Sequence, residues 1–223
     1  FSATSTYTNP LKAVEFFKKT GCDALAISYG TMHGASKGKN VKLRKEIAIA
    51  IKECMMHENL FGVLVSHGSS TVPRYIVDEI NALGGNIQNA YGISIEELKA
   101  AIPCGIGKIN VDTDIRLAVT RNMKEFFHQN PAKRDSASIG KVYELLEEKK
   151  DQFDPRAFLP PIMDTVMYGN IPDQDTADLV EVIEKGVKEA IGTLIVEFGS
   201  FGKAPLVEQV SLEEMAERYK KCK

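Results

Sequence analysis

Residues 62–70 read GVLVSHGSS, a short apolar run that ends in a polar tip of histidine, glycine and serine. The same order occurs at residues 24–34, ALAISYGTMHG, and at residues 106–113, IGKINVDT. Short apolar runs of this kind are typical of parallel strands, which present functional side chains at their C-terminal ends. We therefore expect three parallel strands whose polar tips share one edge of a sheet, with the run at residues 24–29 buried on both faces.

Helical patterns separate these runs. Apolar residues recur at helical spacing in four stretches, at residues 10–19, 43–55, 73–83 and 113–127. Ser94 and Glu97 stand in the order of a capping box, in which each side chain binds the backbone N–H of the other residue at the start of a helix. Alternation of strand and helix over residues 24–127 predicts an α/β fold with parallel strands and right-handed crossovers.

After residue 130 the pattern changes to helices without strands. These helices are predicted at residues 138–149 and 175–191 and after Ser211. We therefore expect a strand-containing part at residues 1–130 and a C-terminal helical extension at residues 131–223. Three strands cannot close a barrel that normally needs eight, so either the first strands lie outside this chain or it forms a small open sheet.

The composition limits the classes of partner. The 223 residues carry a formal charge of −2, so no basic excess favours nucleic acid or an anionic membrane. No apolar run approaches the roughly 20 residues of a membrane span. The four cysteines include no CxxC pair, which favours reduced thiols over a disulfide framework. We expect a cytoplasmic protein that binds neither nucleic acid nor membrane.

Two histidines occupy equivalent positions, because His33 and His67 each follow an apolar run and directly precede a glycine. Imidazole is a preferred zinc ligand, and a catalytic zinc site has about three protein ligands and one open position. The pair therefore predicts a zinc site that lacks at least one ligand, although such a histidine is also common as a hydrogen-bonding loop residue. His57 and His128 end charged helices, and we expect both to be solvated.

Polar tips also precede two predicted helices. Gly68-Ser69-Ser70 lies before the helix that Pro73 opens, and Asn110-Val-Asp-Thr113 lies before the next one. Backbone N–H groups and the dipole at a helix start favour an anion, so the two tips together predict a phosphate site. Ser, Thr and Asp are also ordinary helix caps, and the residues alone leave both interpretations open.

Four segments, taken in order, carry a family resemblance: YTNPLKAVEFFKKTGCDALAISYGTMHG, VLVSHGSSTVP, YGISIEELKAAIPCGIGKINVDTDIRLA and FDPRAFL. They resemble the class II, zinc-dependent fructose-bisphosphate aldolases over nearly the whole chain. The resemblance implies a (β/α)8 TIM barrel, of which this chain carries roughly the last three strands, six to eight, plus the C-terminal helices. It also implies reversible cleavage of fructose 1,6-bisphosphate to dihydroxyacetone phosphate and glyceraldehyde 3-phosphate, in glycolysis or gluconeogenesis.

The resemblance assigns roles to individual residues. His33 and His67 match two zinc ligands, and zinc would act as a Lewis acid; whether a monovalent cation is also required stays open. The residues that match the binding site for the dihydroxyacetone-phosphate part are Gly34, Gly68, Ser69, Ser70, Asn110, Asp112 and Thr113. Arg156 matches an arginine that reaches the far phosphate from a neighbouring subunit, which implies a homo-oligomer, a dimer or a tetramer.

One family segment is absent. The His-Leu-Asp-His segment, which supplies another zinc histidine and the acid/base aspartate, has no counterpart here, so we expect no acid/base residue in this chain. The missing half of the site would belong to an N-terminal part of a longer enzyme. Tagatose-bisphosphate aldolase, which acts on a substrate differing at one hydroxyl, stays an alternative. A non-catalytic fragment that binds phosphate or metal is the other, should 223 residues be the whole gene product.

Overall fold

The computed structural model describes residues 6–33 and 40–221. Its strands β1 (Ala24–Ala26), β2 (Val63–Ser66) and β3 (Ile106–Ile109) form one sheet in the order β1-β2-β3. Both pairs are parallel, which confirms the arrangement predicted from the sequence. Strands β1 and β3 are shorter than the apolar runs at residues 24–29 and 106–111 that predict them, whereas β2 has the expected length but is shifted by one residue and includes Ser66.

Helices precede, connect and follow the strands, as the alternating pattern predicts. They are α1 (Pro10–Thr20), α2 (Lys45–His57), α3 (Arg74–Ala82), α4 (Ile95–Ala101) and α5 (Thr113–Gln129). Local signals set the ends of α1: the Asn9 side chain accepts the N–H of Lys12, Pro10 occupies the first turn, and Gly21 ends the helix with φ of 61°. Residues between Ala101 and β3 form turns, so α4 is as short as expected.

The capping box at α4 is only half formed. Ser94 Oγ accepts the N–H of Glu97, as predicted. The Glu97 carboxylate, however, accepts the N–H of Leu43 at 2.8 Å and pairs with Lys45 at 2.5 Å. Glu97 therefore joins α4 to the segment before α2, because a lysine and a distant N–H compete for its carboxylate.

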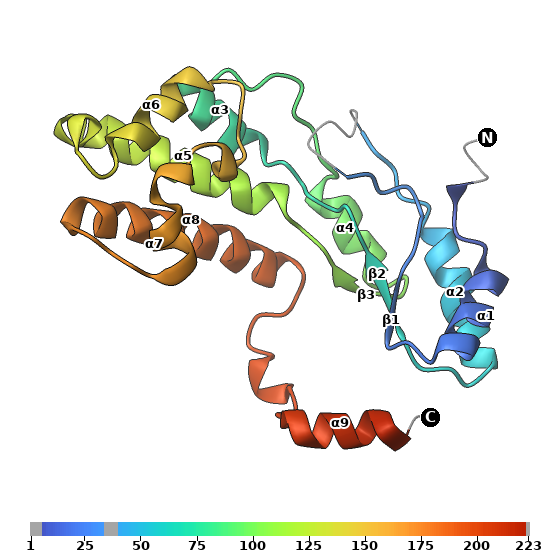
Figure 1. Cartoon of the computed structure of the whole chain (residues 1–223). Helices are drawn as coiled ribbons and strands as arrows, with labels where there is room; N and C mark the ends of the chain where they lie inside the picture. The colour runs from blue at the N-terminus through green and yellow to red at the C-terminus, as the bar shows by residue number, and fades with distance from the viewer. Residues whose placement is uncertain (1–5, 34–39, 222–223) are drawn as a thin grey trace.

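The C-terminal part is helical. It contains α6 (Gly140–Glu148), α7 (Met163–Tyr168), α8 (Gln174–Glu197) and α9 (Leu212–Lys221), with short 3₁₀ turns at Pro131–Asp135, Pro155–Ala157, Pro160–Ile162 and Ala204–Leu206. Figure 1 shows α8 alongside α5, and α9 at the end of an extended segment. Ser211 Oγ accepts the N–H of Glu214, which confirms the predicted cap of α9. Helix α8 is longer than predicted, because its apolar face continues to Val196.

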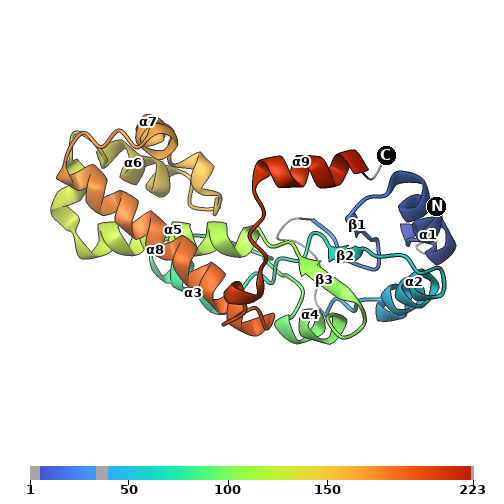
Figure 2. The same ribbon diagram turned by 90° about the horizontal axis from the view of Figure 1, so that it is seen from below.

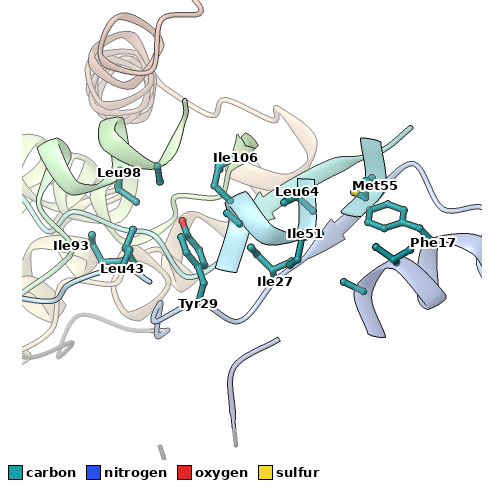
Figure 3. Close-up of a cluster of buried hydrophobic side chains, with 14 residues drawn as sticks. Phe17, Ile27, Tyr29, Leu43, Ile51, Met55, Leu64, Ile93, Leu98 and Ile106 are labelled. Carbon is teal, nitrogen blue, oxygen red and sulfur yellow. The ribbon is translucent and has the colours of Figure 1, made fainter. Parts of the chain in front are cut away.

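One face of the sheet is covered and the other is partly open. Register partners Leu64 and Ile106 are buried with Phe17, Ile51 and other side chains of the cluster in Figure 3. On the opposite face Ala24 and its partner Val63 are exposed, as is Ala26. The expectation that residues 24–29 are buried on both faces is therefore wrong for this strand. In a closed barrel that face is filled by side chains of all the strands, and three strands leave it open.

A second core joins the two predicted parts. Met123 and Phe127 of α5 pack in one buried cluster with three side chains of the C-terminal part. These are Val142 of α6, Leu179 of α8 and Phe158, which follows the 3₁₀ turn at Pro155–Ala157. Figure 2 shows these helices as one group beside the sheet. The division at residue 130 thus falls at a helix end within continuous packing, and it stays a prediction.

None of the helices in the described ranges has the length and apolar character needed to cross a bilayer. The cysteines among the described residues, Cys22, Cys54 and Cys104, are free thiols, as expected.

Candidate functional site

A cleft of about 470 Å³ lies at the C-terminal ends of the three strands. Its lining includes seven of the predicted site residues: His33, His67, Gly68, Ser70, Asn110, Asp112 and Thr113. Ser69 and Arg156 are not in the lining, and Gly34 lies outside the described residues. The strand tips therefore meet at one edge of the sheet, as the sequence predicts.

The two histidines face each other across this cleft. His67 Nδ1 lies 3.0 Å from His33 Nε2, and the ring centroids are 4.6 Å apart. Two nitrogens bound tetrahedrally to one zinc ion, with bonds of about 2.0–2.1 Å, lie about 3.3 Å apart, so a small opening of the pair would admit the ion. The described residues contain no group of three or more potential His, Cys, Asp or Glu ligands. The pair fits zinc but supplies only two of its ligands.

Gly68 allows the two histidine loops to approach. Its φ is 69°, a backbone conformation that residues with a Cβ rarely adopt. A Cβ at this position would lie 3.1 Å from the carbonyl carbon and oxygen of Met32 and 3.2 Å from the nitrogen of His33. The glycine between His67 and Ser69 is therefore required both by its own backbone and by the neighbouring loop.

Ser70 caps the start of α5, not the start of α3. Its Oγ accepts the N–H of Thr113 at 3.0 Å and that of Asp112 at 3.2 Å, and the residue is buried. Asp112 occupies the N-cap position of α5 but makes no side-chain cap. Two of the N–H groups expected to face an anion are thus bonded to Ser70, which acts as the helix cap.

Ser69 lies beneath the cleft in a buried hydrogen-bond network. Its Oγ is 2.6 Å from Ser66 Oγ, which also bonds the hydroxyl of Tyr29, and all three residues are fully buried. The Ser69 N–H donates to the Asn110 carbonyl at 3.2 Å. Burial raises the pKa of Tyr29, so its hydroxyl stays protonated at neutral pH. In this structure Ser69 joins the tips of the three strands.

Lys108 is a lining residue to which the sequence patterns assigned no role. Its ammonium group donates to the Asn110 side-chain oxygen. Among the lining residues that the structure describes it is the only Lys or Arg, and it places a positive charge beside the predicted phosphate site. The sequence could have placed Lys108 beside Asn110, because residues two apart in an extended segment point to the same side and Asn110 was already a predicted site residue.

Arg156 lies at the end of a chain of ion pairs. Arg116 pairs with Asp112 at 2.8 Å and also with Asp154, which pairs with Arg156 at 2.6 Å. The hydrogen bond from Arg156 holds the pKa of Asp154 below its usual value. The Arg156 side chain is 72% exposed, so this pair contributes little stability and leaves the guanidinium accessible. Through Arg116 it is connected to Asp112 at the rim of the cleft.

The remaining histidines are solvated. His57 and His128 are exposed in the last turns of α2 and α5, which confirms the expectation for both.

Comparison with known proteins identifies the family. The family model described as fructose-bisphosphate aldolase class-II matches residues 1–203. The chain therefore belongs to the class II fructose-bisphosphate aldolase family.

Two relatives show how much of such a protein the chain represents. It is 34% identical over 212 residues to the fructose-bisphosphate aldolase of Xanthobacter flavus, covering 95% of this chain and 49% of the relative. It is 36% identical over 214 residues to the fructose-bisphosphate aldolase of Giardia intestinalis, and the match covers 96% of this chain and 53% of the relative. The chain spans about half the length of the curated relatives it matches.

The fold has a counterpart among solved structures. The crystal structure of fructose-bisphosphate aldolase from Campylobacter jejuni matches with a TM-score of 0.50 and 18% identity, over 88% of this chain and 45% of that one. Together with the parallel sheet, this likeness confirms the predicted fold class, a portion of an α/β TIM barrel.

Proposed function

We propose that this chain is the C-terminal part of an enzyme that reversibly cleaves fructose 1,6-bisphosphate to dihydroxyacetone phosphate and glyceraldehyde 3-phosphate with zinc. One observation carries the proposal: a single cleft brings the His33–His67 pair together with the polar tips of β2 and β3. Membership of the class II aldolase family supports the same reaction.

The metal end of the site is the histidine pair. His33 Nε2 and His67 Nδ1 would hold zinc together with ligands from outside the described residues. A bound zinc ion supplies Lewis-acid polarisation of the substrate ketone. Both imidazoles reach the cleft from loops that Gly68 lets approach, so the backbone at Gly68 helps to place the two ligands side by side.

The phosphate end is formed by the tips of β2 and β3. Ser70, Asn110 and Thr113 would bind the phosphate of the dihydroxyacetone-phosphate part, and the Lys108 ammonium adds a favourable charge. Hydrogen bonds to an ionised group are stronger than those between neutral groups, which favours a phosphate over a neutral ligand here.

Proton transfer requires a group that the described lining of this cleft does not supply. Asp112 is the only carboxylate among the described lining residues, and it is engaged in an ion pair with Arg116 at 2.8 Å. We therefore assign the acid/base role to the part of the enzyme that precedes this chain.

The proposal includes a cytoplasmic homo-oligomer in which Arg156 reaches a neighbouring subunit's site.

The test uses the full-length gene product. Its intact mass should be well above 24.6 kDa, and it should cleave fructose 1,6-bisphosphate in a coupled assay that records both triose phosphates. Tagatose 1,6-bisphosphate is assayed in parallel, and a higher kcat/KM for it would reassign the substrate. A product of 24.6 kDa that cleaves neither sugar would support a non-catalytic fragment instead.

A further inference from the structure

Asp114 has a buried carboxylate that none of the roles above uses. It lies in the first turn of α5 and is 3% exposed. One oxygen accepts the N–H of Val72 at 2.8 Å, and the other accepts the N–H of Thr71 at 3.0 Å and its hydroxyl at 2.7 Å. Both oxygens are therefore directed at the two residues that follow Ser70.

Val72 is held in an unfavourable backbone conformation. Its φ is 52°, in the left-handed region that a β-branched residue seldom adopts. Its side chain is buried with Ile76 and Leu117, so the position is well packed in spite of the strain. Such a conformation persists only where the surroundings over-determine it, and the bonds from Asp114 are part of those surroundings.

The contacts between the two segments are reciprocal. Ser70 Oγ accepts two N–H groups from the start of α5, and Asp114 of α5 accepts three groups from Thr71 and Val72. On the other side of the segment, the Ile93 N–H donates to the Ser70 carbonyl at 3.1 Å. A Cβ on Gly92 would lie 2.2 Å from the Thr71 carbonyl, so this neighbour also packs closely.

We propose that Asp114 is a positioning residue for the phosphate end of the cleft: it holds Thr71 and Val72 in their turn and thereby fixes Ser70 against the first turn of α5. Asp114 does not line the histidine cleft. It borders a separate cavity of about 730 Å³ between α3, α4, α5 and α8. It therefore acts on ligand binding through Ser70, and this inference rests on the proposed function of the cleft.

The first variant is Asp114→Asn in the full-length protein. The shape is kept, but an NH₂ group replaces one acceptor and faces N–H donors. We expect the affinity for inorganic phosphate to fall about tenfold and the KM for fructose 1,6-bisphosphate to rise similarly, with kcat changed less than about twofold. The matched control is Asp78→Asn, because Asp78 is an exposed carboxylate that pairs with Arg74. The control should leave all three quantities unchanged.

Adding Val72→Gly separates positioning from mere support of the fold. Glycine adopts a positive φ without strain, so in the Asp114→Asn background it should restore phosphate affinity to within about threefold of the wild type. The same change removes a buried side chain and should lower the Tm further. If phosphate affinity instead falls together with the Tm, Asp114 only supports the fold and the proposal is overturned.

A milder variant covers the case in which Asp114→Asn does not fold. Thr71→Val removes a single hydrogen bond to Asp114 and should weaken phosphate binding about threefold; an unchanged affinity would overturn the proposal.

The outcomes separate the positioning role from the aldolase function. If the wild type binds phosphate but cleaves no sugar bisphosphate, and Asp114→Asn loses phosphate binding, the aldolase function alone is refuted. Wild-type cleavage with unchanged phosphate affinity in Asp114→Asn refutes the positioning role alone. A wild type that binds no phosphate refutes both.

Discussion

His67 Nδ1 lies 3.0 Å from His33 Nε2 although the two residues are 34 positions apart in the chain. The contact exists because β1 and β2 are adjacent parallel strands whose C-terminal ends share one edge. The approach of the two loops depends in turn on Gly68, which has no side chain to collide with Met32 or His33.

Gly68→Ala should separate the histidines. The added Cβ meets the Met32 carbonyl, and the positive φ becomes strained, so we expect zinc affinity to fall at least about tenfold. Zinc affinity is measured by competition with a chromogenic chelator. Gly169→Ala is the matched control, because Gly169 has a φ of 70° with nothing near its Cβ position. The control should lose about 1–2 kcal/mol of stability but no zinc affinity. Equal zinc affinity in both variants would contradict the role of Gly68.

Ser70→Ala should weaken substrate binding and destabilise the start of α5. The N–H groups of Asp112 and Thr113 lose their acceptor, and leaving the buried Thr113 donor unsatisfied costs about 1–3 kcal/mol. We expect a higher KM for the bisphosphate and a lower Tm. Ser211→Ala removes the exposed cap of α9 and should leave the KM unchanged. An unchanged KM in Ser70→Ala would leave Ser70 as a helix cap only.

Arg156→Ala should impair bisphosphate cleavage far more than cleavage of a monophosphate ketose. A charge-assisted contact with the far phosphate is worth about 1.5–3 kcal/mol, so kcat/KM should fall about ten- to hundredfold. Arg74→Ala, an exposed arginine that pairs with Asp78, is the control. Light scattering should show a homo-oligomer. A fully active monomer, or an unaffected Arg156→Ala enzyme, would show that this arginine stays in its own subunit's ion pairs.

Glu97→Gln should lower stability at neutral pH and have little effect in acid. Burial alone would raise the pKa of Glu97, but the hydrogen bonds from Lys45 and from the Leu43 N–H outweigh it, so its pKa lies below the usual 4.5. The ionised carboxylate therefore stabilises the fold above about pH 4.5, and this contribution is lost as the pH falls through the lowered pKa. Urea unfolding at pH 7 and at a series of lower pH values down to about pH 2 measures the difference. Glu96→Gln, on the exposed side of α4, should show no such dependence; a pH-independent loss in Glu97→Gln would contradict the argument.

Much of the fold could be predicted because its signals are local. Apolar runs gave the three strands, and Asn9, Pro10 and Gly21 marked the ends of α1 within one turn of the chain. The expected burial of Ala24 and Ala26 was wrong, because burial depends on what covers a face and the sequence of one strand does not contain that information.

The site was predicted in outline but not in its contacts. His33 and His67 could be paired from matching strand ends, whereas the preference of Ser70 for α5 and of Glu97 for Leu43 depends on residues more than 40 positions away. Lys108 went unassigned because a lysine in a strand has no motif of its own. Its place beside Asn110 follows only from the alternation of side chains.

The central claim is that His33 and His67 hold the metal of a class II aldolase site, and chelator sensitivity of fructose 1,6-bisphosphate cleavage tests it most directly. The full-length enzyme should lose cleavage in EDTA and regain it with added zinc. His67→Ala should be inactive under both conditions, while His57→Ala, an exposed histidine at the end of α2, should behave as the wild type. Cleavage that survives both EDTA and His67→Ala, and that borohydride traps as a lysine adduct, would contradict the account.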